Sequence, residues 1–226
     1  MKRRLGGVIV LALAAVVVWY FTRGDEQDAA FRSRRSATRM LGKYLAKKYP
    51  QGHVVIISNP FTAVSPSREI IKMEQAGITG LREGFGKNRL LKVVLPELKP
   101  TARTDPRSLL ADPETPTPLS YLVTDDAFDK VTADADLAVS LIGLPVELQR
   151  VETWQNPGKP RFALLLPDLR MIGNRAAVRA AMKNGKLAAF VFANPDRANA
   201  KTPFVLATPE TLDSLAQQFP TLLPPD

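Results

Sequence analysis

The chain has 226 residues, of which 45% are hydrophobic and 23% are charged, and it contains one histidine and no cysteine. This composition excludes a disordered or low-complexity chain and leaves enough residues for one well-buried domain. The lack of cysteine excludes disulfides, thiolate nucleophiles and zinc–sulfur sites, and it leaves the redox compartment open. A single histidine, His53, argues against a histidine-based metal site or catalytic triad.

The formal net charge is +9, and much of it falls between Arg32 and Lys48. A basic segment close to a membrane is attracted to anionic lipid by about 1 kcal/mol per charge. The same charge would suit nucleic acid, but no basic strand interleaved with aromatic residues supports that interpretation. We therefore expect a solvated basic face near lipid and no nucleic-acid partner.

Residues 5–21 form an uncharged apolar run behind Lys2, Arg3 and Arg4. As a helix the run would be roughly 25 Å long, which is at the short end of what crosses a hydrocarbon core. Trp19 and Tyr20 at its far end suit the headgroup level. The run predicts a single-pass transmembrane helix over residues 1–22, with membrane lipid as the partner of residues 5–21. Two alternatives are a cleaved signal peptide, for which the sequence before Asp25 fits poorly, and a buried core helix.

The orientation of this anchor is read from its basic flanks. The short tail Lys2-Arg3-Arg4 favours a cytoplasmic N-terminus and an extracytoplasmic domain. Arg23, Arg32 and the pair at 34–35 lie on the other flank, so the charge rule is not clean. We expect a cell-membrane protein with its domain on the extracytoplasmic side.

Short apolar runs alternate with helical patterns along the rest of the chain. Residues 23–35 read as a polar connector, 36–220 as one α/β domain and 221–226 as a tail. The expected strands cover residues 53–58, 90–95, 137–142, 161–166, 187–192 and 204–207. This alternation predicts a mainly parallel, doubly wound (Rossmann-like, three-layer) sheet of about five or six strands.

Several helix boundaries carry local signals. A helix is expected from Ser36, and Ser65-Pro66 fits the start of another. That second helix carries Gly77, Gly80 and Gly84, which we attribute to close packing on the sheet, since phosphate loops place glycines before a helix. The remaining expected features are Thr124 as a cap, a helix over 174–184, a last helix from Thr208-Pro209 and a long proline-rich surface loop over 96–118.

Most strands run into a proline near their carboxyl ends, and polar residues gather there. Ligands of open parallel sheets bind beyond these ends, at the switch point in strand order. The candidate ligand-binding residues are Asn59, Phe61 as a stacking surface, Glu97, Asp168, Asn194 and Asp196. The competing interpretation is that proline ends the strands and that the acids are solvated loop residues.

Paired acids are the main candidates for chemistry. Asp168 together with Asp196 or Glu97 would form a carboxylate pair or hold Mg²⁺ if their strands were neighbours. The sequence contains no nucleophile elbow, Walker lysine loop or dinucleotide glycine fingerprint. We assign no catalytic residue, no metal ligand and no cofactor. His53 begins a strand, at the end of the sheet opposite to the proposed crevice.

The order of elements from about Gly52 to Phe219, including the stretch Ala176–Val191, resembles one lobe of periplasmic-binding-protein-like or flavodoxin-like doubly wound folds. The resemblance is one of layout and brings no family motif or binding residue. The leading hypothesis is a membrane-anchored, extracytoplasmic domain that binds a small ligand or an envelope protein partner. The alternative is an Asp/Glu-dependent, Mg-assisted enzyme acting on a small or phosphorylated substrate. A third interpretation is a scaffold that makes contact through Trp154 and the 96–118 loop.

Overall fold

A six-stranded sheet runs through the computed structural model of the protein, which describes residues 27–64, 67–105, 119–158, 160–196 and 203–225. The strands are β1 (Val54–Ile57), β2 (Leu91–Val94), β3 (Leu137–Ser140), β4 (Arg161–Leu165), β5 (Leu187–Ala193) and β6 (Phe204–Ala207). Their order is β2-β1-β3-β4-β5-β6, and every neighbouring pair is parallel except β5 with β6. The predicted mainly parallel α/β sheet is confirmed.

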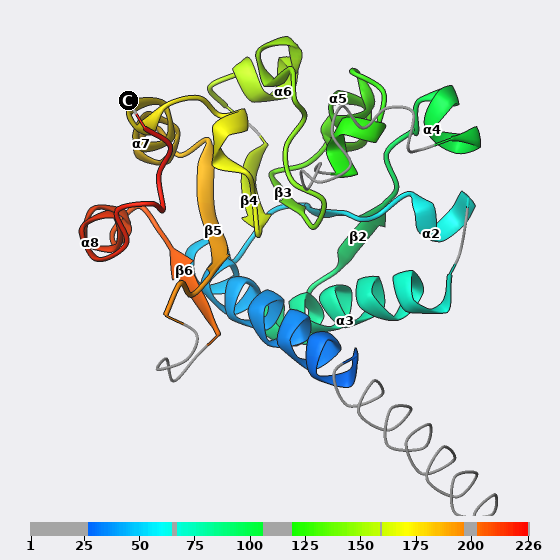
Figure 1. The fold of residues 1–226 in the computed structure, drawn as a ribbon, viewed down its shortest axis with the longest axis horizontal. Helices are drawn as coiled ribbons and strands as arrows, with labels where there is room; N and C mark the ends of the chain where they lie inside the picture. Colours follow the sequence, from blue (N-terminus) through cyan, green and yellow to red (C-terminus); the bar gives the residue numbers. More distant parts are fainter. Residues whose placement is uncertain (1–26, 65–66, 106–118, 159, 197–202, 226) are drawn as a thin grey trace, which may run out of the picture.

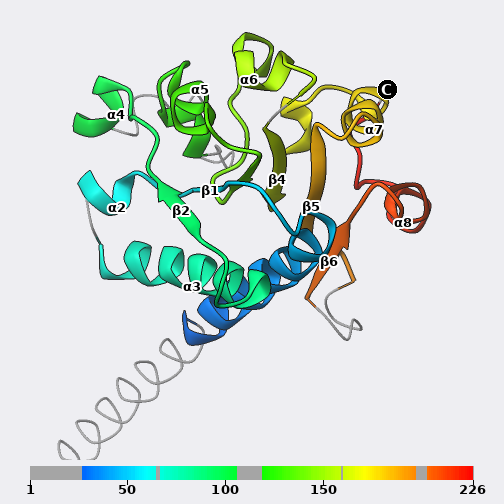
Figure 2. The same cartoon turned by 180° about the vertical axis from the view of Figure 1, so that it is seen from behind.

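Helices cover both faces of this sheet (Figures 1 and 2). A long helix over residues 27–48 and α3 (Arg68–Phe85) lie on one face. On the other face lie α5 (Ala127–Thr132), α6 (Glu152–Gln155), α7 (Arg175–Lys183) and α8 (Leu212–Gln218). The short helices α2 (Phe61–Val64) and α4 (Pro100–Thr104) and the 3-10 turns η2 (Leu119–Leu122), η3 (Leu148–Arg150) and η4 (Leu169–Met171) complete the elements.

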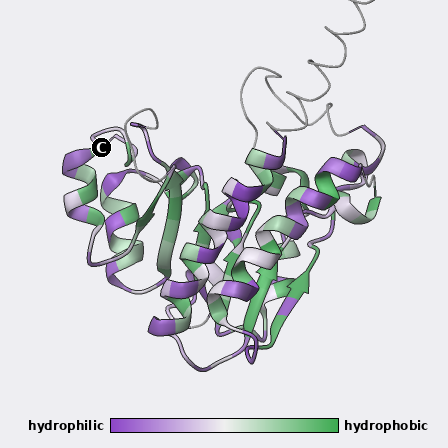
Figure 3. Cartoon of the chain, turned by 90° about the horizontal axis from the view of Figure 1, so that it is seen from below, coloured by the Kyte–Doolittle hydropathy of each residue, from purple (hydrophilic) through white to green (hydrophobic). Residues whose placement is uncertain are grey.

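The central strands are apolar on both sides because both of their faces are covered. In β1, Val55 and Ile57 join one core cluster while Val54 and Ile56 join the other. Side chains of a strand alternate between faces, so a continuous apolar run is what a doubly covered strand requires. Figure 3 shows these apolar strands between helices that mix polar and apolar residues.

The glycines of α3 allow it to cross the helix over 27–48 at short distance. A Cβ at Gly80 would overlap the Thr38 hydroxyl and the Arg35 carbonyl, and a Cβ at Gly84 would lie 2.6 Å from the Arg39 carbonyl oxygen. Glycine lacks the atom that would keep the two backbones apart. The close packing predicted for these glycines is present, but their partner is a helix and not the sheet.

Some predicted helix boundaries were wrong. Residues 27–35, expected as a connector, already belong to the helix that was predicted from Ser36. The side chain of Ser67, not Ser65, caps α3 by accepting a hydrogen bond from the Ile70 amide at 3.1 Å. The N-cap residue of α5 is Asp126 instead of Thr124. The last helix, α8, begins at Leu212, after the predicted start at Thr208-Pro209.

Three other expectations concern the outer parts of the chain. The predicted anchor over 5–21 and residues 106–118 of the proline-rich loop lie outside the described residues. Among the helices that are described, none has the length and apolar character needed to cross a membrane. The first part of the 96–118 segment includes α4 and Leu98, which is 2% exposed and pairs with Val123 in an isolated bridge. Residues beyond 220 include Leu223, which is 4% exposed and packs into the core.

Candidate functional site

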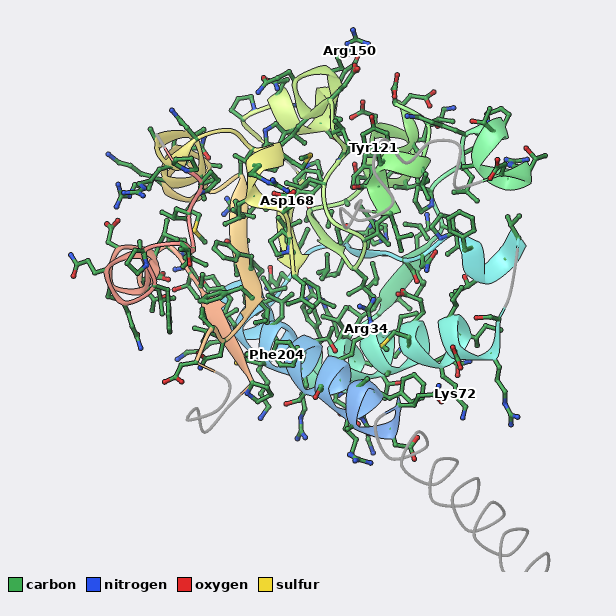
Figure 4. All side chains as sticks on the ribbon, viewed as in Figure 1. Arg34, Lys72, Tyr121, Arg150, Asp168 and Phe204 are labelled. Carbon is green, nitrogen blue, oxygen red and sulfur yellow. The ribbon has the colours of Figure 1, made fainter. Side chains whose placement is uncertain are left out.

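A crevice of about 400 Å³ opens at the carboxyl ends of β3 and β4. Residues 141–143 and 165–167, at the carboxyl ends of these strands, line it together with Leu119. Its charged lining residues are Arg34, Asp168 and Arg170, two of which Figure 4 labels. β2 lies on one side of β1, whereas β3 to β6 follow on its other side, so the switch point in strand order lies between β1 and β3. The crevice lies beside this switch point, where open α/β sheets bind ligands.

Arg34 reaches the crevice from the helix over 27–48. Its Nη2 donates hydrogen bonds to Glu74 Oε1 at 2.5 Å and to the Leu141 carbonyl oxygen at 3.4 Å. The side chains of Arg34 and Glu74 are only 15% and 6% exposed. Arg34 Nε is buried and has no hydrogen-bond partner among the described residues. A buried charge needs a partner, so this pair fixes the position of the guanidinium at the crevice.

The other carboxylate oxygen of Glu74 extends the network to β1. Glu74 Oε2 accepts hydrogen bonds from the Ser58 hydroxyl at 2.7 Å and from the Asn59 amide at 3.3 Å. The buried carboxylate of Glu74, on α3, thus contacts both Arg34 of the helix over 27–48 and the residues after β1. Arg34 in turn contacts the carbonyl of Leu141, after β3. These hydrogen bonds hold the Arg34 guanidinium in place at the crevice, although its Nε has no partner among the described residues.

Asp168 and Arg170 also line the crevice, and they form a two-pronged ion pair. Arg170 Nε donates to Asp168 Oδ1 at 2.9 Å, and Nη2 donates to Oδ2 at 2.6 Å. The hydrogen bond from the Arg170 side chain lowers the pKa of Asp168 below its ordinary value. Asp168 is therefore a carboxylate at neutral pH, which can accept hydrogen bonds from a ligand but is a poor proton donor.

The same ion pair also borders a second hollow, of about 500 Å³, on its other side. That hollow is lined by Phe190 and Phe192 of β5 and by residues 220–225. The Asp168–Arg170 pair thus stands between a polar crevice and a more apolar hollow. A ligand that displaced the exposed Arg170 side chain would gain access to both.

Leu166 holds a strained backbone in the lining of the crevice. Its φ is 47°, and it is the one described residue other than glycine with a positive φ. It is also 47% exposed, although it is a large apolar side chain. Bulky residues rarely adopt this conformation, and the strain, about 1–3 kcal/mol, is found mostly at functional sites. The amide of Leu166 donates to the Val191 carbonyl at 2.8 Å, which holds the turn in place.

Of the six candidate residues predicted from the sequence, only Asp168 lines this crevice. Asn59 is 7% exposed, and its side-chain oxygen accepts a hydrogen bond from the Phe61 amide. Phe61 is 9% exposed and packs in the core, so its ring has little free face for a ligand to stack on. Asn194 and Asp196 follow β5 and are joined by a hydrogen bond from the Asp196 amide to the Asn194 side chain at 3.0 Å.

Strand order keeps Glu97 and Asp168 apart. Glu97 follows β2 and Asp168 follows β4, and β1 and β3 lie between these strands. At about 4.8 Å for each strand interval the two strand ends are roughly 14 Å apart. Glu97 forms ion pairs with Arg103 at 3.5 Å and Lys130 at 3.7 Å instead. Within the described ranges no cluster of three His, Cys, Asp or Glu side chains could hold a metal ion.

Trp154 and His53 lie away from the crevice. Trp154 is 9% exposed, and its ring packs at 5.4 Å from that of Phe162, so the prediction that it forms a contact surface was wrong. His53 Nδ1 lies 2.9 Å from the Asp134 carbonyl oxygen, just before β1. This is the end of the sheet opposite to the crevice, as the sequence predicted.

Comparisons with known proteins give a likeness of layout. No family model matches the chain, and no curated protein matches it. Similar solved structures include a glucose-galactose binding protein, GanP, from Geobacillus stearothermophilus (13% identity, TM-score 0.44), which aligns over 79% of this chain and 61% of its own. An ABC transporter periplasmic solute binding protein from Actinobacillus succinogenes with bound D-allose (12% identity, TM-score 0.45) aligns over 80% and 61%.

An ABC transporter solute binding protein from Burkholderia graminis in complex with D-arabinose also aligns, at 13% identity and a TM-score of 0.45, over 80% of this chain and 61% of its own. The chain therefore spans about three-fifths of the length of these proteins. The predicted resemblance was to periplasmic-binding-protein-like folds, and these binding proteins are among the solved structures that the chain is similar to. At this similarity the ligands of those proteins are not transferred to this chain.

Proposed function

We propose that this domain binds a small polar ligand in the crevice between Arg34 and the Asp168–Arg170 pair. The observation that carries the proposal is that a guanidinium fixed by buried Glu74 and an oriented carboxylate line the same hollow beside the switch point. Preorganised polar groups in a largely preformed hollow are what small-molecule sites require. The strained turn at Leu166, in the lining of the same hollow, gives independent support.

The lining limits the chemistry of the ligand. Asp168 accepts hydrogen bonds, whereas Arg34 and Arg170 donate them. Backbone groups after β3 and β4 add both kinds. The ligand is therefore a molecule that donates and accepts at neighbouring positions, as polyhydroxylated compounds and amino acids do. A volume of about 400 Å³ limits it to a small molecule.

Binding is favoured over turnover by the state of the two acids at the site. Asp168 has a lowered pKa and is held by Arg170, and both oxygens of Glu74 are engaged. A general acid or base works best with a pKa near the working pH and with a free path to the substrate. These carboxylates orient guanidinium groups instead.

The proposal includes a location. The apolar run over 5–21 would anchor the protein in a membrane, with the domain on the extracytoplasmic side, as the basic tail Lys2–Arg4 favours. Two separate assays test this location. The first is alkaline carbonate washing of isolated membranes, and the second is protease treatment of cells whose outer envelope has been opened and whose cytoplasmic membrane is intact. An anchored domain stays in the pellet and is digested from outside the cytoplasmic membrane. Release by carbonate, or protection from the protease, would contradict the location.

The ligand proposal is tested by native mass spectrometry of the full-length protein extracted gently from its own membrane. We expect a small adduct on the wild type that is lost in Asp168→Asn. Asp213→Asn is the matched control, because it removes a carboxylate from an exposed ion pair with Arg179 that does not line the crevice. An adduct that survives in Asp168→Asn, or no adduct at any extraction strength, would refute the proposed site.

A further inference from the structure

Lys186 is a buried cation without a buried anion to balance it. It directly precedes β5 and is 5% exposed. Its Nζ donates hydrogen bonds to the Thr153 carbonyl at 2.7 Å and to the Pro160 carbonyl at 3.0 Å. No ion pair between described residues includes Lys186, and the nearest charged neighbour that acts on it, Arg161, is also a cation. Burial and Arg161 both lower the pKa of Lys186.

Lys186 is one of the residues that line a cavity of about 290 Å³ between α6 and α7. Trp154 forms one wall, and the alanines 177, 180 and 181 of α7 leave room on the other. The amide side chains of Gln149, Gln155 and Asn184 lie at its border. A lysine has three N–H donors, so one is left after the two carbonyls, and the centroid of the Phe162 ring lies 5.9 Å from Nζ. The cavity therefore combines one charged donor, neutral amide groups and an aromatic wall.

We propose that this cavity is a second ligand site, which binds a small monocarboxylate through the Lys186 ammonium group. A buried ammonium without a counterion is costly, and a carboxylate that enters the cavity would offset part of that cost. One cation matches one negative charge. A phosphate dianion would need further cations, and Lys186 is the one cation among the described residues that line the cavity. The site is at the amino ends of β4 and β5, at the end of the sheet opposite to the Arg34 crevice, and it does not depend on the proposed function.

The alternative is that Lys186 only pins the backbone between Thr153 and Pro160. Both interpretations predict that loss of the ammonium destabilises the fold, so stability alone does not separate them. Binding does, because a structural pin predicts no response to carboxylates. Trp154 lies in the cavity wall and reports on occupancy by its fluorescence.

The experiment uses the full-length chain in detergent micelles with Trp19→Phe, which leaves Trp154 as the sole tryptophan. The probe is sodium butyrate, titrated against sodium chloride at equal ionic strength. We expect a saturable change in Trp154 fluorescence with butyrate and none with chloride. In Lys186→Met, which keeps the aliphatic stem, the apparent affinity should fall at least tenfold.

A second pair of variants keeps the test decisive if Lys186→Met does not fold. Ala180→Leu fills the border of the cavity from the exposed side of α7, whereas Ala176→Leu is equally exposed on α7 and does not line the cavity. Butyrate binding should be lost in the first and kept in the second. An equal response to chloride would mean an adventitious ion only. That result, no saturable response, or equal binding by Ala180→Leu and Ala176→Leu would overturn the proposal.

Discussion

Replacing Gly80 with alanine tests whether the crossing of two helices holds the domain together. Alanine in place of glycine within a helix would by itself stabilise α3 by about 1 kcal/mol. The new Cβ, however, would overlap both the Thr38 hydroxyl and the Arg35 carbonyl oxygen, so the helix over 27–48 would have to move away. Overpacking of this kind costs about 1–3 kcal/mol and more where backbone must shift. We expect a net loss of about 2 kcal/mol in the free energy of unfolding.

Urea unfolding of the full-length chain in micelles, followed by far-UV circular dichroism, measures this loss. Gly158→Ala is the control, because its Cβ would meet only the Asn156 side chain, at 3.3 Å. Adding Thr38→Ala to Gly80→Ala should restore part of the stability, since it removes one of the two overlaps. If the free energy of unfolding of Gly80→Ala exceeded that of the wild type by the gain of about 1 kcal/mol expected from helix propensity alone, the two helices would not cross as closely as the structure shows.

Three further predictions follow from single contacts. The ion pair with Lys48 at 2.8 Å lowers the pKa of Glu210 to about 2 from 4.5, so its contribution is present above pH 4.5 and lost as the pH falls to about 2. Both side chains are about half exposed and solvent screens the pair, so the unfolding free energies of wild type and Glu210→Gln should differ only slightly at pH 7 and converge at pH 2. Burial raises the pKa of Tyr44 to about 12 from 10.0. Its contribution to the free energy of unfolding is therefore present below pH 10 and lost as the pH rises towards 12. Absorbance at 295 nm should show a late-titrating tyrosine that is absent in Tyr44→Phe. Trp154→Ala should cost about 3–5 kcal/mol in urea unfolding because the ring is buried against Phe162, and an unchanged midpoint would restore the surface interpretation.

The strands could be predicted because each is a short apolar run that ends at a proline or glycine. The helix over 27–48 was predicted too short because its first turns are rich in arginine and serine, which pack only in part. The start of α3 was misassigned because Ser65 and Ser67 flank the same proline and both fit a cap. A helix partner for Gly80 depends on contacts between distant segments, which no local pattern records.

The candidate site was only partly predictable for the same reason. Asp168 was predicted because it follows a strand. Its separation from Glu97 is set by strand order, and the sequences of short parallel strands do not show which strands are neighbours. Arg34 was missed although the sequence holds a signal for it. It lies on the helical stripe of Ala37 and Leu41, and a charged residue on a buried stripe needs a buried partner.

The helix over 27–48 is a core element and also carries Arg34. Ala37, Leu41 and Leu45 are at most 1% exposed, so a force applied at residue 27 would act directly on the packed interface between this helix and α3. A soluble version cut at residue 36 would lack Arg34 and leave Glu74 without its cation. For the same reason, proteolysis within residues 27–36 would remove part of this packed helix. A shift of this helix relative to α3 would therefore reach the crevice through the Arg34–Glu74 ion pair.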